Sequence, residues 1–175
     1  MTQQGPLVIA TRTSLLLVLV LTVQLGVVSR LELLDVQGDL MLLVAVCAGL
    51  AAGADRGAAV GFAAGISFDL LLQSPFGLSA LTYSIVAYVA GSLHDSVLRA
   101  AWWIPVATAA IASSLGVILY GVFGTMVGEE LLDTDLLRIA LVVGTMNAIV
   151  APAVLRAVRW ATCTSERVRA RPVMR

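Results

Sequence analysis

The stretch that decides the fold is residues 57–91, which read GAAVGFAAGISFDLLLQSPFGLSALTYSIVAYVAG. This stretch is apolar over membrane length and yet contains one carboxylate, that of Asp69. Gly57, Gly61 and Gly65 precede Asp69 at four-residue spacing, so on a helix they form one ridge that ends at the carboxylate. A ridge without side chains lets a neighbouring backbone approach closely, which favours helix packing in lipid as its purpose.

The composition places the chain among membrane proteins. Apolar residues make up 59% of the chain and charged residues 13%, and long runs carry no charge. This is more apolar surface than a soluble domain of this length needs for its core. The runs are continuous and do not alternate as the strands of a β-barrel do. We therefore expect an all-α integral membrane protein.

Apolar runs bounded by charges or turn residues predict six membrane-spanning helices, because about 20 residues cross the hydrocarbon core. The runs cover residues 13–29, 40–54, 57–73, 77–93, 101–127 and 136–158. They predict one compact six-helix transmembrane domain over residues 1–160, followed by an arginine-rich tail over residues 161–175. A signal peptide is the competing interpretation of the first run. No small-residue cleavage pattern follows that run, so an uncleaved helix is favoured.

The arginines predict the orientation of the bundle. All eleven basic residues are arginines, and with six spans nine of them lie on one side, against only Arg30 and Arg138 on the other. Basic residues in short loops are retained in the cytoplasm, so we expect both termini there. We interpret the acidic loops of the opposite side as solvated, with contact to an external partner as the alternative. These loops carry Glu32, Asp35, Asp39, Glu129, Glu130, Asp133 and Asp135.

The position of Asp69 inside a span needs a physical reason. An ionised Asp near a helix centre costs about 2.5–3.5 kcal/mol on insertion scales, so its carboxylate is expected to face protein or water. Three roles stay open: a cap for the helix after the turn at residues 74–77, a hydrogen bond to the bundle or to a partner chain, or ligand binding and proton transfer. The structural roles are favoured, because a proton relay usually uses a second intramembrane ionisable group.

No catalytic residue, metal ligand or cofactor site is expected. His94, the single histidine, is interpreted as a surface residue of a cytoplasmic loop. An intramembrane aspartyl protease needs two carboxylates, and a serine hydrolase needs a base near its nucleophile. Neither metal-ligand spacing nor a phosphate-binding glycine loop is present in the sequence. Cys47 and Cys163 are expected to be reduced and structural.

Other small residues extend the packing pattern, and tryptophans are expected to anchor the membrane boundary. Pro152 predicts a bend in the last helix. The second and fourth runs carry ridges at Ala45, Gly49 and Gly53 and at Ala80, Ser84, Ala87 and Gly91, and the tryptophans are Trp102, Trp103 and Trp160.

The arginine-rich end of the chain is expected to lie on the inner leaflet. Each arginine near an anionic surface contributes about 1 kcal/mol of attraction. A cytoplasmic protein partner is the alternative, and nucleic acid binding is not expected for a tail this short and tethered. The membrane-surface candidates are Arg156, Arg159, Arg167, Arg169 and Arg171.

The block at residues 61–81, GFAAGISFDLLLQSPFGLSAL, is followed by a helix that ends at Gly91 and resembles the rod shape-determining protein MreD family. The family pattern corresponds to Gly65, Asp69, Pro75 and Gly77. Chain length, six spans and cytoplasmic termini are similar to that family as well. The same pattern is similar to that of the substrate-binding S components of energy-coupling factor vitamin transporters. The resemblance therefore implies an S-component-like bundle.

The resemblance implies a non-enzymatic scaffold of the bacterial cell-elongation complex in the inner membrane, supporting peptidoglycan synthesis and cell shape. Such a scaffold would bind the single-span protein MreC and, through it, RodA, a penicillin-binding transpeptidase and, where present, MreB. The alternative is an S component of a vitamin transporter. The sequence leaves a bound lipid and a homo-oligomer open. Candidate positions for helix packing or partner contact are Gly57, Gly61, Gly65, Asp69, Pro75, Gly77 and Gly91.

Overall fold

The computed structural model describes residues 4–26, 32–33, 36–71, 76–94, 97, 103–128 and 135–162. Most of these residues are helical. The main helices are α1 (Gln4–Gly26), α2 (Leu40–Ala52), α3 (Ala54–Asp69), α4 (Leu78–Ser92), α6 (Ile104–Met126) and α7 (Leu136–Thr162). Between α1 and α2, strand β1 (Glu32–Leu33) pairs antiparallel with β2 (Val36–Gln37). The predicted helical membrane class is confirmed, and the short hairpin is an element that the apolar runs did not predict.

Six full membrane spans are not confirmed. Among the described residues, three helices are long and apolar enough to cross a membrane by length and composition, and these are Leu7–Gly26 of α1, all of α6 and all of α7. Helices α2, α3 and α4 have 13, 16 and 15 residues. At 1.5 Å per residue they reach about 20–24 Å, which is less than the roughly 30 Å hydrocarbon core.

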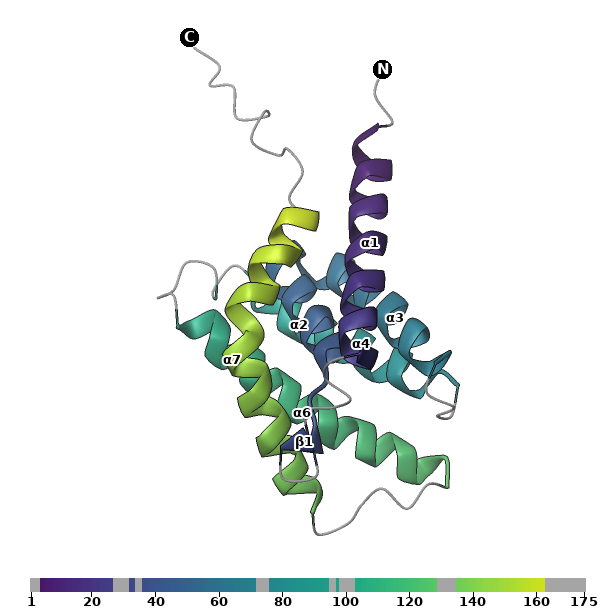
Figure 1. Ribbon diagram of the computed structural model, residues 1–175, viewed down its shortest axis with the longest axis vertical. Helices are drawn as coiled ribbons and strands as arrows, with labels where there is room; N and C mark the ends of the chain where they lie inside the picture. Colours follow the sequence, from purple (N-terminus) through teal and green to yellow (C-terminus); the bar gives the residue numbers. More distant parts are fainter. Residues whose placement is uncertain are drawn as a thin grey trace.

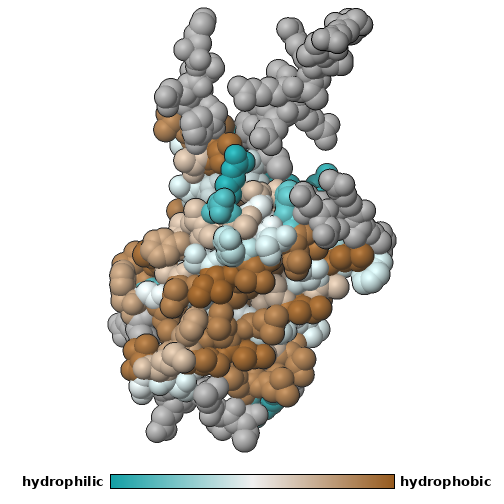
Figure 2. All heavy atoms as spheres, turned by 180° about the vertical axis from the view of Figure 1, so that it is seen from behind, coloured by the Kyte–Doolittle hydropathy of each residue, from teal (hydrophilic) through white to brown (hydrophobic). Residues whose placement is uncertain are grey.

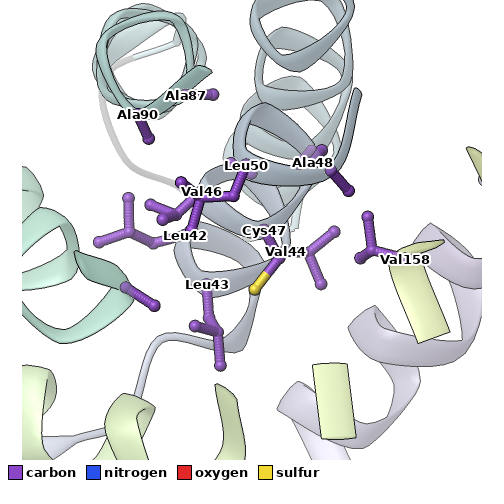
Figure 3. Packing of buried hydrophobic residues seen from close by; sticks show 14 of the residues in the cluster. Leu42, Leu43, Val44, Val46, Cys47, Ala48, Leu50, Ala87, Ala90 and Val158 are labelled. Carbon is purple, nitrogen blue, oxygen red and sulfur yellow. The ribbon is translucent and has the colours of Figure 1, made fainter. Parts of the chain in front are cut away.

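The burial of α2 explains why such a short helix is stable in this bundle. Every residue from Met41 to Ala51 is buried. Ala87 and Ala90 of α4 lie on one side of α2, and Val158 of α7 lies on the other (Figure 3). Because protein surrounds α2, its length does not have to match the lipid, provided that protein groups satisfy the backbone at its ends. The core of the fold is therefore α2 with its neighbours packed around it.

Figure 1 shows α1 and α7 running in opposite directions, with the start of α1 and the end of α7 at the same end of the molecule. Both helices are longer than predicted, since α1 begins at Gln4 and α7 continues through Pro152 to Thr162. Arg12 therefore lies inside α1, where its guanidinium is 5.1 Å from the ring centroid of Trp160. This cation–π contact gives the arginine a partner within the helical part of the bundle.

Candidate functional site

The glycine ridge of α3 packs inside the chain. Gly57, Gly61 and Gly65 are all buried. A Cβ atom added to Gly61 would lie 2.6 Å from the carbonyl oxygen of Tyr83 in α4, and one added to Gly65 would overlap the backbone of Ala80. These distances are too short for any side chain, so α3 and α4 meet backbone to backbone.

The neighbouring helices contribute matching glycines to this contact. A Cβ at Gly57 would overlap the backbone of Gly49 in α2, and one at Gly91 of α4 would lie 2.6 Å from Cα of Ala54 in α3. The Oγ of Ser84 also donates a hydrogen bond of 3.2 Å to the carbonyl of Ala58. The ridges predicted on three helices therefore fit one another, and α2, α3 and α4 form a tight three-helix unit.

Asp69 caps the beginning of α4. Its Oδ2 accepts hydrogen bonds from the N–H groups of Gly77, at 2.9 Å, and Ala80, at 3.3 Å, and its Oδ1 accepts one from Ser79 N–H at 3.3 Å. Gly77 has φ of 96°, a left-handed conformation that glycine adopts without steric cost. Of the three roles left open for Asp69, these bonds support the cap. An acceptor at a helix start satisfies N–H groups that have no partner within the helix.

A second carboxylate, that of the half-buried Asp39, lies where α2 begins. Its Oδ1 accepts a 2.9 Å hydrogen bond from Leu42 N–H, its Oδ2 accepts one from the hydroxyl of Tyr83 in α4, and its carbonyl accepts one of 3.1 Å from the Asn147 amide in α7. Burial raises the pKa of the Asp39 carboxyl above its usual 3.8, and the hydrogen bonds from Leu42 and Tyr83 act in the opposite direction. The interpretation of Asp39 as a solvated loop residue is therefore wrong.

Gln24 of α1 completes this polar cluster. Its amide nitrogen donates to the carbonyl of Gly38 at 2.7 Å, and its amide oxygen accepts from Leu40 N–H at 2.9 Å. Asp39, Gln24, Tyr83 and Asn147 thus connect the start of α2 to α1, α4 and α7. The partners Tyr83 and Asn147 are 44 and 108 residues from Asp39, which no local pattern predicts. The position of Asp39 directly before an apolar helical run does indicate an N-cap, and this signal is present in the sequence.

His94 closes the other end of α2. Its ring is half-buried, and Nδ1 lies 2.6 Å from the carbonyl oxygen of Leu50. A carbonyl only accepts hydrogen bonds, so Nδ1 carries the proton in this contact. His94 is thus only partly exposed, and its ring binds the last turn of α2, a contact that the sequence did not predict. Both ends of the short central helix are thus supported by side chains from other parts of the chain.

On the outside of the bundle, α4 and α6 enclose a groove of about 370 Å³. Large aliphatic side chains line it, and two of them, Val89 and Ile111, are 56% and 62% exposed. Figure 2 shows how widely apolar side chains cover the face of the molecule that it presents. The lining residues are Ile85, Val86, Val89, Ala90, Leu93, Thr108, Ile111, Ala112, Leu115, Ile118, Leu119 and Val122.

The remaining candidate positions are surface arginines and residues outside the description. Arg156 and Arg159 are exposed near the end of α7, on the same helix as Trp160. The candidates Pro75, Arg167, Arg169 and Arg171 lie outside the described residues. The same holds for Arg30, Arg99, Trp102 and Cys163 and for the acids at 35, 129, 130 and 133.

The family model for rod shape-determining protein MreD matches residues 3–151. The chain belongs to the MreD family. The predicted resemblance is therefore confirmed over most of the chain, and the family implies a membrane protein with a role in rod shape determination. The match ends before Pro152, so the arginine-rich end lies outside it. No curated protein and no solved structure matched, and the S-component-like architecture is not confirmed.

Proposed function

We propose that this MreD family member is a non-enzymatic scaffold of the cell-elongation complex, and that it binds a single-span, MreC-like partner through helix packing. The family match over residues 3–151 carries the proposal. Through that partner the scaffold recruits RodA, a penicillin-binding transpeptidase and, where present, MreB, and so supports peptidoglycan synthesis. These two carboxylates agree with a scaffold role, because Asp69 and Asp39 both accept hydrogen bonds that hold helix ends together.

The groove between α4 and α6 is the surface that suits a partner helix. The glycine ridges are occupied by contacts within the chain, so a partner has to meet other residues. From Thr108 to Val122 the groove follows α6 for about 21 Å, most of the hydrocarbon thickness of about 30 Å. Helices associate in lipid mainly through van der Waals packing, which an apolar groove of large side chains provides.

We further propose that the protein lies in the bacterial inner membrane with both termini in the cytoplasm. The start of α1 and the end of α7 share one end of the molecule (Figure 1). The described arginines near that end include Arg12, Arg56, Arg156 and Arg159, and the positive-inside rule retains such residues in the cytoplasm. A periplasm-active reporter that functions when fused to the C-terminus would refute this orientation.

Filling the groove tests the scaffold proposal. Ala112, which is half-buried in the groove, is changed to Phe, and the matched control is Ala153→Phe on an exposed face of α7. The protein is co-expressed with the MreC-like protein of the same genome and purified in mild detergent. We expect Ala112→Phe to lose the partner and to give rounded cells in a rod-shaped host, whereas Ala153→Phe retains both functions.

Two outcomes would contradict the proposal. Full recovery of the partner with Ala112→Phe would show that the α4–α6 groove is not the binding surface. A wild-type protein that retains no MreC-like chain, but co-purifies with a cytoplasmic ATPase pair and binds a vitamin-like ligand, would support the S-component alternative instead.

A further inference from the structure

A second groove, of about 410 Å³, lies between α1 and α3, and none of the residues that line it also lines the α4–α6 groove. Small residues line it, among them Ala10 of α1 and Ala59 and Ala63 of α3, and α1 and α3 make few contacts with each other. Ala52 of α2 and Thr162 of α7 also line it. The groove is therefore at the end of the bundle that carries the start of α1 and the end of α7.

The chemistry of this groove changes along its length. Arg56 lines it in the first turn of α3, together with the hydroxyl-bearing residues Thr13 and Ser14 of α1. Ala63 lies seven residues further along α3, about 10 Å along the helix axis at 1.5 Å per residue. Val60 and Leu17 add apolar wall to the groove. The groove thus has one cationic end and an apolar remainder.

Arg56 is placed to bind an anion. Its side chain is exposed and lines the groove. Asp55 precedes it, but consecutive side chains point about 100° apart around a helix, and Asp55 does not line the groove. A guanidinium matches the geometry of a phosphate, and the positive end of the α3 dipole adds to the attraction.

We propose that the α1–α3 groove binds one phospholipid with an anionic headgroup. Arg56 holds the phosphate at the membrane surface, and an acyl chain lies along Ala59 and Ala63 toward the bilayer interior. Charge complementarity at one end and apolar walls along the remainder select this occupant over a wholly apolar helix. The proposal does not depend on the MreC-like partner, because lipid is present wherever the protein is inserted.

Native mass spectrometry of the delipidated protein in mild detergent tests this site. The probes are palmitoyl-oleoyl phosphatidylglycerol and the phosphatidylcholine with the same chains. We expect one phosphatidylglycerol to be retained in preference to phosphatidylcholine. Arg56→Gln should weaken phosphatidylglycerol binding about fivefold, the equivalent of ~1 kcal/mol for one cation at an anionic surface. The matched control Arg138→Gln, also exposed but outside the groove, should leave it unchanged.

A second experiment blocks the apolar end of the α1–α3 groove. Ala63→Leu should fill the groove and weaken both lipids, while Ala153→Leu on α7 should weaken neither. Thermal unfolding verifies that each variant is folded, and Ala59→Leu replaces Ala63→Leu if the latter lowers the unfolding temperature. Glycerol 3-phosphate at equal concentration should not displace the lipid, since the acyl chain supplies much of the contact.

Three results would overturn the lipid site. Equal losses with Arg56→Gln and Arg138→Gln would mean diffuse surface charge. Unchanged lipid binding with Ala63→Leu would place the chain elsewhere, and if that variant also lost a co-purifying partner chain, the groove would be a helix site. Displacement by glycerol 3-phosphate would identify a site for phosphate alone.

Discussion

The two faces of α4 make opposite kinds of contact. Toward α2 and α3 the helix presents small residues such as Ala80, Ala87 and Gly91, and there the backbones touch. Toward α6 it presents Ile85 and Val89, which line an open groove. Backbone contact leaves no room for a different neighbour, whereas a groove lined by large side chains accepts one. The inner face of α4 therefore stabilises the fold, and the outer face is available for recruitment.

The largest effect is expected from Gly65, at the centre of the inner contact. Gly65→Leu should prevent α3 and α4 from closing, because even a Cβ at this position overlaps the backbone of Ala80. Gly65→Ala should be milder than Leu but still cost about 1–3 kcal/mol, since backbone has to move to admit the methyl group. The measurement is the yield of folded protein in mild detergent and its thermal unfolding temperature.

Gly26→Ala is the matched control for that substitution. A Cβ at Gly26 meets no atom within 4 Å, so the change should leave the unfolding temperature nearly unaltered. If Gly65→Leu were as stable as the wild-type protein, the tight α3–α4 contact would be disproved. The glycine ridge of α3 would then be expected to contact a partner chain instead.

Asp69 should have the next largest effect, because it holds the end of the same contact. Asp69→Leu leaves the N–H groups of Gly77, Ser79 and Ala80 without this acceptor, and one buried unsatisfied donor costs about 1–3 kcal/mol. Asp69→Asn keeps one acceptor oxygen, and Asn is about as good as Asp at helix starts. We expect thermal unfolding and partner co-purification to rank wild type, Asn and Leu in that order. Equal losses for Asn and Leu would indicate that the charge itself is required, as in proton transfer.

The sequence predicted the local features of this unit and missed its long-range ones. Four-residue glycine spacing and the turn before Gly77 are visible in consecutive residues, so the ridge and the possible cap were expected. The pairing of Asp39 with Tyr83 depends on how α2 and α4 pack, and the contact of His94 with Leu50 depends on the same packing. The shortness of α2 has a similar cause, because only the assembled bundle shields it from lipid. Hydropathy alone therefore predicted a span where the structure has the short, enclosed helix α2.

Asp39 offers a smaller, pH-dependent comparison with Asp69. The pKa of Asp39 is raised above 3.8 by burial, so between that value and its raised pKa the folded protein binds more protons than the unfolded chain. Its contribution to the free energy of unfolding should therefore be largest below 3.8 and should fall as pH rises through the raised pKa. Asp39→Asn keeps an acceptor for Leu42 N–H and removes this titration. The difference in unfolding temperature between variant and wild type should grow in favour of the variant from about pH 4 to about pH 7.

The control for that titration is Asp55→Asn, which changes an exposed carboxylate in the first turn of α3. This variant reports the effect of removing a carboxylate that is exposed to solvent. An Asp39→Asn profile parallel to that of the wild-type protein would mean that Asp39 is ionised in the same way in the folded and unfolded states.

The smallest effect on the fold is expected on the outer face of α4. Val89 is 56% exposed in the groove, so Val89→Ala leaves a space that lipid can fill, and stability should change by less than about 0.5 kcal/mol. The same substitution at Val44, which is fully buried in α2, should cost on the order of 1–2 kcal/mol because the cavity stays empty. Partner retention should rank the two variants in reverse, with Val89→Ala about twofold weaker, as expected for the loss of ~0.5 kcal/mol of helix contact. If Val89→Ala destabilised the fold as much as Val44→Ala and left partner retention intact, the outer face of α4 would be part of the core, and the groove would have no role in recruitment.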